Sequence, residues 1–364
     1  MLARRGTSGG DAVGLRGTEI GELLEHYGRP IQPLLDDPDL TEIMVNDFRD
    51  IWVEREGRLI RTDAAWDDEH DLINFIRQIA NSLDQEVDDE NPMLDARLPD
   101  NTRINATLRP ISLRGAVMSI RPFPKKVFRI EDLVARGAIP ERAVALLRLA
   151  VLNRLNMMIV GGTGSGKTTV LRCVCQMIPH DERVCTAEDT AENLLPDHPH
   201  VVPFEVPRPR RRRDRGAHAK PITMADLIID ILRKRPDRPI VGEIRTPEAC
   251  AALVDAVNTG HGGMVSTMHA NGTEDAFDRM DLLFARQAQN VGFEAIRRLT
   301  RRNIDVVAYV ARDRALDGTV TRRLKEIAWV DGMELRPLCR HTRRGGHVFD
   351  DGNIARFEEE LALA

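Results

Sequence analysis

The sequence predicts an α+β domain at the N-terminal end, followed by an α/β domain with a mostly parallel sheet, and three observations support this. The chain has 364 residues, enough for two domains of about 150 residues each. Short strand-like runs surround one amphipathic helix in residues 18–121. In residues 131–338, apolar strands alternate with helical patterns, which is typical of βαβ units. A stiff, polar segment with prolines, residues 122–130, is the expected linker.

The composition excludes several classes of protein. Hydrophobic residues make up 42% and charged residues 30% of the chain, so a folded core is expected. The net charge of −5 gives no general positive field for nucleic acid or anionic lipid. No uncharged apolar run approaches the ~18 residues of a membrane span, so we expect a cytoplasmic protein, at most peripheral at the inner face of the membrane. The cysteines lack metal-type spacing and indicate a reducing compartment: Cys173, Cys175, Cys185, Cys250 and Cys339.

The first domain is expected to follow a disordered tail, because residues 1–17 are rich in glycine and lack apolar periodicity. Apolar residues at helical spacing predict a helix over residues 72–83, with acidic residues favouring the positive end of its dipole. Strand-like runs occur at residues 43–45, 51–53, 103–108 and 116–120. Alternation places Arg103 and Asn105 on one face of their strand.

The second domain is predicted from its alternating pattern. Helices are expected at about residues 140–155, from residue 168, and at 224–232, 248–257 and 274–285. Strands are expected at residues 157–160, 184–187, 201–206, 240–243, 264–268 and 304–310. Residues 339–364 match no interpretable pattern, and we treat them as a C-terminal tail of unknown role.

Residues 161–168, Gly-Gly-Thr-Gly-Ser-Gly-Lys-Thr, fill a phosphate-loop motif between an apolar strand and a helix. Glycines are needed because backbone N–H groups must approach phosphate oxygens more closely than a Cβ would allow. We expect the Lys167 ammonium to bridge the β- and γ-phosphates and the Thr168 hydroxyl to ligate Mg²⁺. An ordinary glycine-rich turn is the alternative. The predicted nucleotide-binding residues are Gly161, Gly162, Thr163, Gly164, Ser165, Gly166, Lys167, Thr168 and Thr169.

Splitting a β–γ bond also needs a carboxylate that orients the attacking water or holds Mg²⁺. Glu243 ends an apolar run and should lie at the carboxyl edge of a strand, where open α/β sheets bind ligands. Gly242 stands where many phosphate-loop proteins carry a metal-binding aspartate. Glu188 and Asp189 follow another strand and offer a second acidic pair. Taken alone, a solvated strand end for Glu243 and a helix cap for the acidic pair are open alternatives.

Two histidines bracket one short predicted strand, and both could reach the same sheet edge. His261 lies in a glycine-rich segment and His269 follows the strand, so they could sense a γ-phosphate. Hydrogen-bonded turn residues are the open alternative. Metal binding by the pair is not expected, because no third ligand stands at suitable spacing.

These motifs resemble the type II/IV secretion and pilus-assembly ATPases, most closely their CpaF/TadA branch, from about Leu40 to Val330. Four motifs in order carry the resemblance: the phosphate loop as Walker A, residues 187–192 as the Asp box, residues 235–245 as Walker B and residues 258–271 as the His box. The resemblance implies a RecA-like P-loop domain that binds ATP and Mg²⁺. It also implies that the acidic and histidine candidates act on water, Mg²⁺ or the γ-phosphate: Glu243, Glu188, Asp189, His261 and His269.

The resemblance extends to the first domain, whose residues 98–106 and 119–123 look like the family's N-terminal strands. Those strands carry arginines to the nucleotide, so Arg103 and Arg121 are expected to stabilise charge on the phosphoryl group. A pair of ordinary surface arginines is the alternative. Weaker candidates for contacts from a neighbouring subunit are Arg233, Arg235 and Arg238.

Two features depart from the family pattern. Pro239 cannot donate a hydrogen bond within a buried strand, unless it marks the strand's start. The basic run of residues 208–215 stands where a mild loop is expected. It is either a solvated loop or a docking segment for anionic lipid, nucleic acid or an acidic partner.

The function that the resemblance implies is ATP hydrolysis by a homohexameric ring that drives secretion, pilus assembly or conjugative transfer. The partner would be a platform protein in the inner membrane. ATP would draw the N-terminal domain down through its arginines, and hydrolysis would release it. Two other functions stay open: a nucleic-acid-translocating motor, which the aromatic content of 4% disfavours, and a scaffold that binds ATP without turnover.

Overall fold

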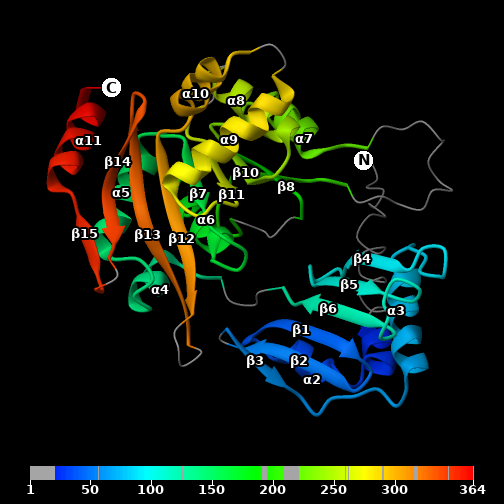
Figure 1. The fold of residues 1–364 in the computed structure, drawn as a ribbon. Coiled ribbons are helices and arrows are strands. Elements are labelled where there is room, and N and C mark those ends of the chain that lie inside the picture. Colours follow the sequence, from blue (N-terminus) through cyan, green and yellow to red (C-terminus); the bar gives the residue numbers. More distant parts are fainter. Residues whose placement is uncertain are drawn as a thin grey trace, which may run out of the picture. The chain divides into compact units, whose positions relative to one another are not determined.

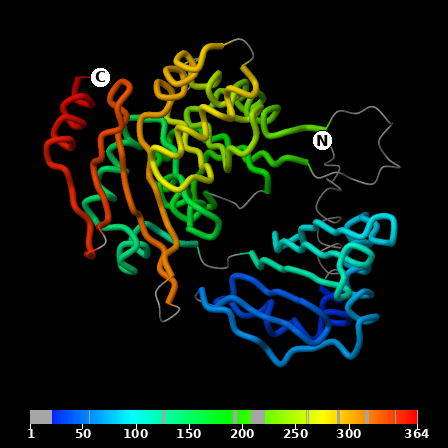
Figure 2. Tube along the Cα trace, viewed as in Figure 1, coloured from blue at the N-terminus to red at the C-terminus, as the bar shows by residue number. Residues whose placement is uncertain are grey.

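The computed structural model describes residues 21–55, 57–123, 127–190, 195–207, 221–258, 260, 262–288, 291–314, 319–342 and 344–363. They form two units, one consisting mainly of residues before 128 and the other mainly of residues from 128 onward (Figures 1 and 2). The boundary lies within the expected linker, residues 122–130. The expected tail, residues 1–17, and the basic run, residues 208–215, lie outside the described residues.

The N-terminal unit contains a six-stranded sheet in the order β3-β2-β1-β6-β5-β4, with every neighbouring pair antiparallel (Figure 1). The strands are β1 (Leu40–Asp47), β2 (Asp50–Arg55), β3 (Arg58–Arg61), β4 (Met93–Arg97), β5 (Arg103–Thr107) and β6 (Val117–Arg121). Helices α2 (Gln32–Asp36) and α3 (Glu69–Ser82) accompany them. The α+β architecture predicted for this part is therefore present.

Helix α3 has the acidic first turn and the buried apolar face that its sequence predicts. The Asp68 carboxylate accepts the Asp71 backbone N–H and caps the first turn. Leu72, Phe75 and Ile76 are fully buried in one core with residues of the sheet. The apolar stripe at three- and four-residue steps is thus the face that packs. Strand β4 was not predicted, because its five residues bury only Leu94 and Ala96 and expose the Asp95 side chain between them.

The second unit contains a nine-stranded sheet in the order β15-β14-β13-β12-β7-β11-β10-β8-β9. Six neighbouring strands are parallel: β7 (Met157–Val160), β8 (Val184–Glu188), β9 (Val201–Glu205), β10 (Arg238–Ile244), β11 (Val265–Met268) and β12 (Val306–Arg314). The antiparallel pairs β13–β14 and β14–β15 extend one side, so the sheet is mixed. Pro239 lies at the start of β10, next to Cys185, which is where proline is tolerated.

Helices cover both faces of this sheet (Figures 1 and 2). One core includes α4 (Ile130–Ala135), α5 (Glu141–Leu152), α6 (Lys167–Cys175) and α11 (Asp351–Leu363). The other includes α7 (Met224–Leu232), α8 (Pro247–Asn258), α9 (Thr273–Gln287) and α10 (Phe293–Arg302). Every residue of β7, β8 and β11 is buried, and β7 reads as a continuous apolar run, as expected for a strand covered on both faces. In the described part of the chain, no helix is long and apolar enough to cross a membrane.

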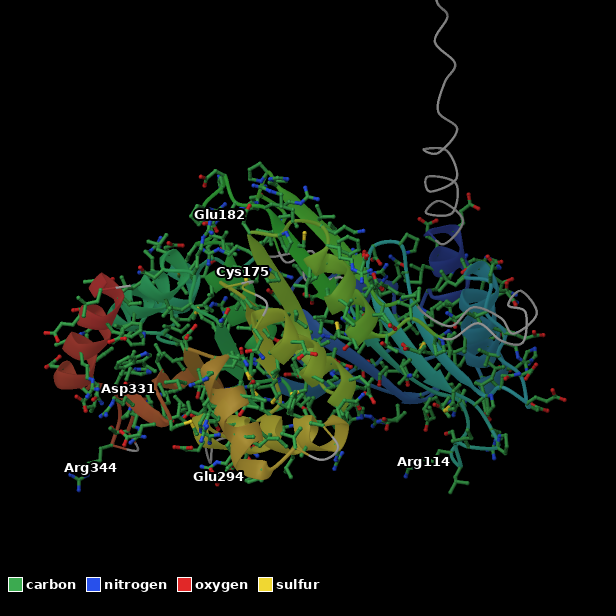
Figure 3. The ribbon with its side chains drawn as sticks, turned by 90° about the horizontal axis from the view of Figure 1, so that it is seen from above. Arg114, Cys175, Glu182, Glu294, Asp331 and Arg344 are labelled. Carbon is green, nitrogen blue, oxygen red and sulfur yellow. The ribbon has the colours of Figure 1, made fainter. Side chains whose placement is uncertain are left out.

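The boundary predicted after residue 338 is wrong. It cuts β14 (Glu334–His341), which pairs with β13 (Val320–Asp331) and β15 (His347–Phe349). Helix α11 packs back on these strands: the Phe357 and Trp329 rings are 5.5 Å apart, and Asp331 (Figure 3) accepts ion pairs from Arg336 and Arg356. The segment was missed because polar and charged residues occupy much of these strands and hide the apolar alternation.

Candidate functional site

The phosphate loop connects β7 to α6 at the carboxyl edge of the parallel strands. Gly164 and Gly166 have φ values of +68° and +95°, which L-residues with a Cβ rarely adopt. Gly161 is needed for a different reason: a Cβ built there would lie 2.3 Å from the Val310 carbonyl oxygen and 2.5 Å from the Ser165 hydroxyl. The strand, the glycine loop and the helix predicted from the motif are all present.

We expect Gly161→Ala to destabilise this unit and Gly162→Ala to leave it almost unchanged. A Cβ at Gly161 would collide with backbone, whereas a Cβ at Gly162 would meet no atom within 4 Å. Overpacking of this kind typically costs about 1–3 kcal/mol of unfolding free energy. Thermal unfolding of the two variants without nucleotide measures the difference, and equal melting temperatures would contradict this reading of the loop.

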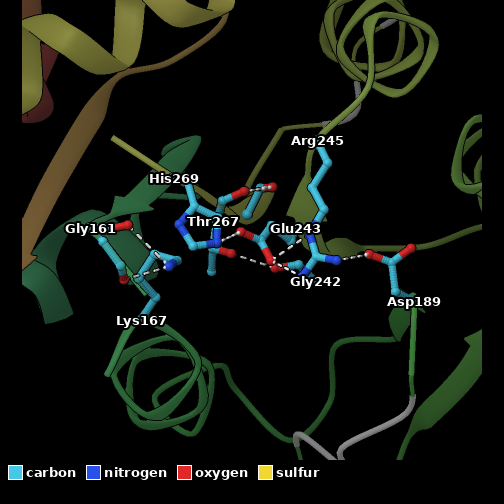
Figure 4. Close-up of polar contacts among 10 residues, drawn as sticks. Gly161, Lys167, Asp189, Gly242, Glu243, Arg245, Thr267 and His269 are labelled. Atoms are coloured by element: carbon cyan, nitrogen blue, oxygen red, sulfur yellow. Dashed lines mark hydrogen bonds and ion pairs between the residues drawn. The ribbon is translucent and has the colours of Figure 1, made fainter. Parts of the chain in front are cut away.

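Lys167 begins α6, and its ammonium lies inside the loop. Nζ donates to the carbonyl oxygens of Gly161 and Gly162, each at 3.0 Å (Figure 4). Burial lowers the pKa of Lys167, and the Glu243 carboxylate opposes that shift. The Ser165 hydroxyl is buried and accepts or donates no hydrogen bond within the described residues. The loop therefore offers spare donors, a cation and a helix N-terminus in one place, which fits a phosphate chain.

Glu243 lies near the end of β10, between a histidine and an arginine (Figure 4). Its Oε1 is 2.8 Å from Nε2 of His269, and its Oε2 accepts from Nε of Arg245 at 2.9 Å. Only 14% of the Glu243 side chain is exposed, so this is a held carboxylate and not a solvated strand end. Burial lowers the pKa of His269, and the positive charges of Lys167, Arg245 and Arg279 add to this against the pull of Glu243.

The acidic pair is also at this edge. Glu188 is buried, and its Oε1 accepts the Thr186 hydroxyl at 3.0 Å. A Cβ on Gly242 would lie 3.4 Å from the Glu188 Cγ, so the Glu188 side chain occupies the space beside that glycine. Asp189 lies 3.6 Å from Nη1 of Arg245, which therefore bridges the two acidic sites (Figure 4).

A magnesium ion would find few protein ligands here. The described residues contain no group of three or more acidic, histidine or cysteine side chains that could hold a metal by themselves. Thr168, half-buried in the first turn of α6, and the carboxylates of Glu188 and Asp189 supply oxygens. This fits Mg²⁺, which keeps several waters and takes its other ligands from substrate phosphates.

The remaining candidates divide between the units. Arg103 and Arg121 belong to the N-terminal unit, where they stand directly opposite each other on β5 and β6. His261 lies outside the described residues. Arg238 is wrong as a contact for a neighbouring subunit: its side chain is 0% exposed and pairs with Glu182, which leaves nothing to reach outward.

Sequence reasoning missed three polar residues at this edge. Arg245 holds both acidic sites, and the Thr267 hydroxyl donates to the Gly242 carbonyl at 2.7 Å. Arg322 donates from Nε to the Gly164 carbonyl at 2.8 Å. Arg245 follows Glu243 by two positions in the Walker B segment and could have been found from that spacing. Arg322 could not, because its contact depends on where β13 lies in the sheet.

Comparison with known proteins agrees with the geometry. The family described as "Type II/IV secretion system protein" matches residues 25–316. The type IV secretion system protein VirB11 of Brucella suis is 31% identical over 342 residues, covering 85% of this chain and 90% of that protein. An uncharacterised protein of Methanocaldococcus jannaschii is 40% identical over 239 residues, covering 64% of this chain but only 32% of that relative. The solved structure of the Legionella pneumophila ATPase DotB has a TM-score of 0.59 at 19% identity, over 86% of this chain and 81% of that one, which supports the fold alone.

Proposed function

The chain belongs to the type II/IV secretion system protein family, and we propose that it hydrolyses ATP to power secretion, pilus assembly or conjugative transfer at the cytoplasmic face of a membrane. One observation carries the proposal: the phosphate loop, the Lys167 ammonium and the Glu243 carboxylate lie at one sheet edge, close enough for the two charges to influence each other. A loop alone binds phosphate. Hydrolysis also needs a group that orients the attacking water, and a carboxylate beside the loop supplies it.

The chemistry follows from the positions of these groups. The backbone N–H groups of the loop and the first turn of α6 would bind the β- and γ-phosphates, and Lys167 would turn from the two loop carbonyls to them. Glu243 would accept a hydrogen bond from a water and direct its oxygen at the γ-phosphorus. The bond from the γ-phosphorus to the bridging oxygen then breaks and ADP leaves with that oxygen. Inorganic phosphate carries the oxygen of the water, and Glu243 would take the proton of the water and return it to the released phosphate.

Magnesium fits this scheme as a charge-neutralising ion. Thr168, Glu188 and Asp189 would hold it directly or through water, and when bound it would stabilise the charge that develops on the bridging oxygen. Arg245 would hold the Glu243 and Asp189 carboxylates in fixed positions relative to each other, because it forms an ion pair with each of them.

The proposal also covers the two N-terminal arginines and the assembly of the chain into a homohexameric ring. Arg103 and Arg121 stand directly opposite each other on β5 and β6, so one pair of strands carries both cations. We infer that they contact the phosphates and couple nucleotide binding to movement of the N-terminal unit. His261 and His269 would sense the γ-phosphate. Membership of the CpaF/TadA branch, a RecA-like ATPase fold, a homohexamer and a membrane platform partner are part of the same proposal.

Release of inorganic phosphate from ATP by the purified full chain tests this function. The wild-type chain should turn ATP over slowly in the presence of Mg²⁺, and chelation of Mg²⁺ with EDTA should stop it. A chain that binds ATP but releases no phosphate would instead be a scaffold. Turnover that rises steeply on addition of DNA would favour the nucleic-acid motor.

Hydrolysis should decline in acid because His269 becomes protonated. Its pKa lies below the ordinary histidine value of about 6.5, so the ring is neutral at pH 7, with Nε2 2.8 Å from Oε1 of Glu243. Protonation below that value creates a full ion pair with Glu243 and weakens this carboxylate as an acceptor for water. A pH–rate profile should show this acid limb for the wild type and lose it for His269→Gln. The same limb in both proteins would contradict the assignment.

A further inference from the structure

We propose that Arg322 is a positioning residue for the ATP site: its Nε–H holds the Gly164 carbonyl away from the phosphates, so that the N–H of Ser165 faces them. This inference rests on the proposed function, because it states how the ATP-binding loop is kept in its receptive shape. Arg322 itself touches the loop from outside and is not assigned a contact with ATP.

The contact joins distant parts of the chain. Arg322 is on β13 and donates to the Gly164 carbonyl at 2.8 Å, across 158 residues of sequence. Its Cδ lies 3.8 Å from where a Cβ on Gly166 would stand, so the side chain crosses the loop over two glycines. Arg312, on β12, approaches the same place, with Nη1 3.6 Å from a Cβ built on Gly164. Both arginines therefore lie within van der Waals reach of the positions that side chains on these two glycines would occupy.

Peptide geometry connects the contact to the phosphate site. The Gly164 carbonyl and the Ser165 N–H belong to one planar trans peptide unit and point in opposite directions. Fixing the carbonyl on the outside therefore fixes the N–H on the inside. There the Ser165 N–H makes only a long bond of 3.4 Å to the Gly162 carbonyl, and the Ser165 hydroxyl is buried without a partner in the described chain. Both donors are thus available to a phosphate oxygen.

Gly164 needs such a restraint. Its φ of +68° is one of several conformations that glycine populates readily, and within the loop the peptide that follows it is restrained by the long bond from the Ser165 N–H to the Gly162 carbonyl. A rotated peptide would turn a carbonyl oxygen toward the phosphates and repel them. Loss of Arg322 should therefore weaken ATP binding, with little effect on the chemical step at Glu243, which Arg322 does not contact.

Two variants separate the hydrogen bond from the charge. Arg322→Met keeps an unbranched chain of similar length but removes both donor and charge. Arg322→Gln removes the charge but places an N–H donor at the same position along the side chain as Nε of arginine. Arg323→Met is the matched control: it removes a neighbouring arginine of β13 that contacts His341 and Asp313.

Equilibrium binding of labelled ATP and the steady-state KM and kcat test the proposal. Arg322→Met should raise the Kd and KM by about two- to tenfold, the worth of one hydrogen bond, with kcat nearly unchanged. Arg322→Gln should restore most of the affinity, and Arg323→Met should keep it. If Arg322→Met binds as tightly as wild type, or if glutamine fails to rescue, the positioning role is overturned while the proposed function stands. If the wild type itself binds no ATP, both the positioning role of Arg322 and the proposed function are contradicted.

Discussion

Glu243→Gln should reduce kcat for ATP hydrolysis by at least about 100-fold and leave ATP binding intact. Glutamine keeps the size of the side chain but is a weak acceptor for the proton and hydrogen bonds of the attacking water, and general-base assistance is typically worth about 10²–10⁴-fold. Binding should persist because the loop and Lys167 are unchanged. The affinity for ATP should rise slightly, since a negative charge near the γ-phosphate is removed. Phosphate-release kinetics and labelled-ATP binding on one preparation measure both quantities.

The matched control is Glu248→Gln. Glu248 is an exposed carboxylate in the first turn of α8, five positions after Glu243, and contacts none of the site residues described above. Its substitution should leave kcat within about twofold of wild type, as expected for a surface position. A Glu243→Gln protein with the turnover of wild type would remove Glu243 from the mechanism.

Arg301→Met should lower the free energy of unfolding by about 3–5 kcal/mol, because it leaves a buried charge without its partner. Arg301 and Asp281 join α10 to α9, with Nη1 3.2 Å from Oδ2 and side chains 3% and 1% exposed. The Arg301 guanidinium also lies 4.9 Å from the centre of the Phe277 ring. After the substitution, the Asp281 carboxylate keeps only the Thr300 hydroxyl among the bonds described here. Urea denaturation followed by circular dichroism measures the loss.

Two further variants test the cause of that loss. Arg302→Met removes the next, exposed arginine of α10 and should change stability by less than about 0.5 kcal/mol. Asp281→Asn combined with Arg301→Met removes both charges and should recover much of the lost stability, because no isolated ion is left inside. A double variant as unstable as Arg301→Met alone would show that packing, and not the buried charge, causes the effect.

Much of the second unit could be predicted because its parallel strands are buried on both faces. Strand β7 reads as an unbroken apolar run, and β10 contains the apolar run 239–242. The loop that carries Lys167 follows the first run, and Glu243 follows the second directly. Since the carboxyl ends of neighbouring parallel strands share one edge, placing each residue at a strand end was enough to bring these two together.

What could not be predicted depends on long-range pairing or on burial of charge. Strands β13 to β15 lie at one end of the nine-stranded sheet. Their many charged residues mask the apolar pattern of the residues that they contribute to the core, which include Leu324, Ile327 and Leu338. Arg238 was expected to contact a neighbouring subunit, but Glu182 pairs with it inside the protein, where arginine is rarely fully buried. Contacts such as Arg322 with Gly164 follow from strand order, which local sequence does not encode.

Retention of radiolabelled ATP by the purified full chain, in the presence of Mg²⁺, tests the central claim most directly. Wild type should hold the nucleotide, Lys167→Ala should lose at least about 90% of that binding by removing the cation of the loop, and the exposed Lys234→Ala should bind as wild type does. A wild-type chain that retains no labelled ATP, or a Lys167→Ala chain that retains it fully, would contradict the account.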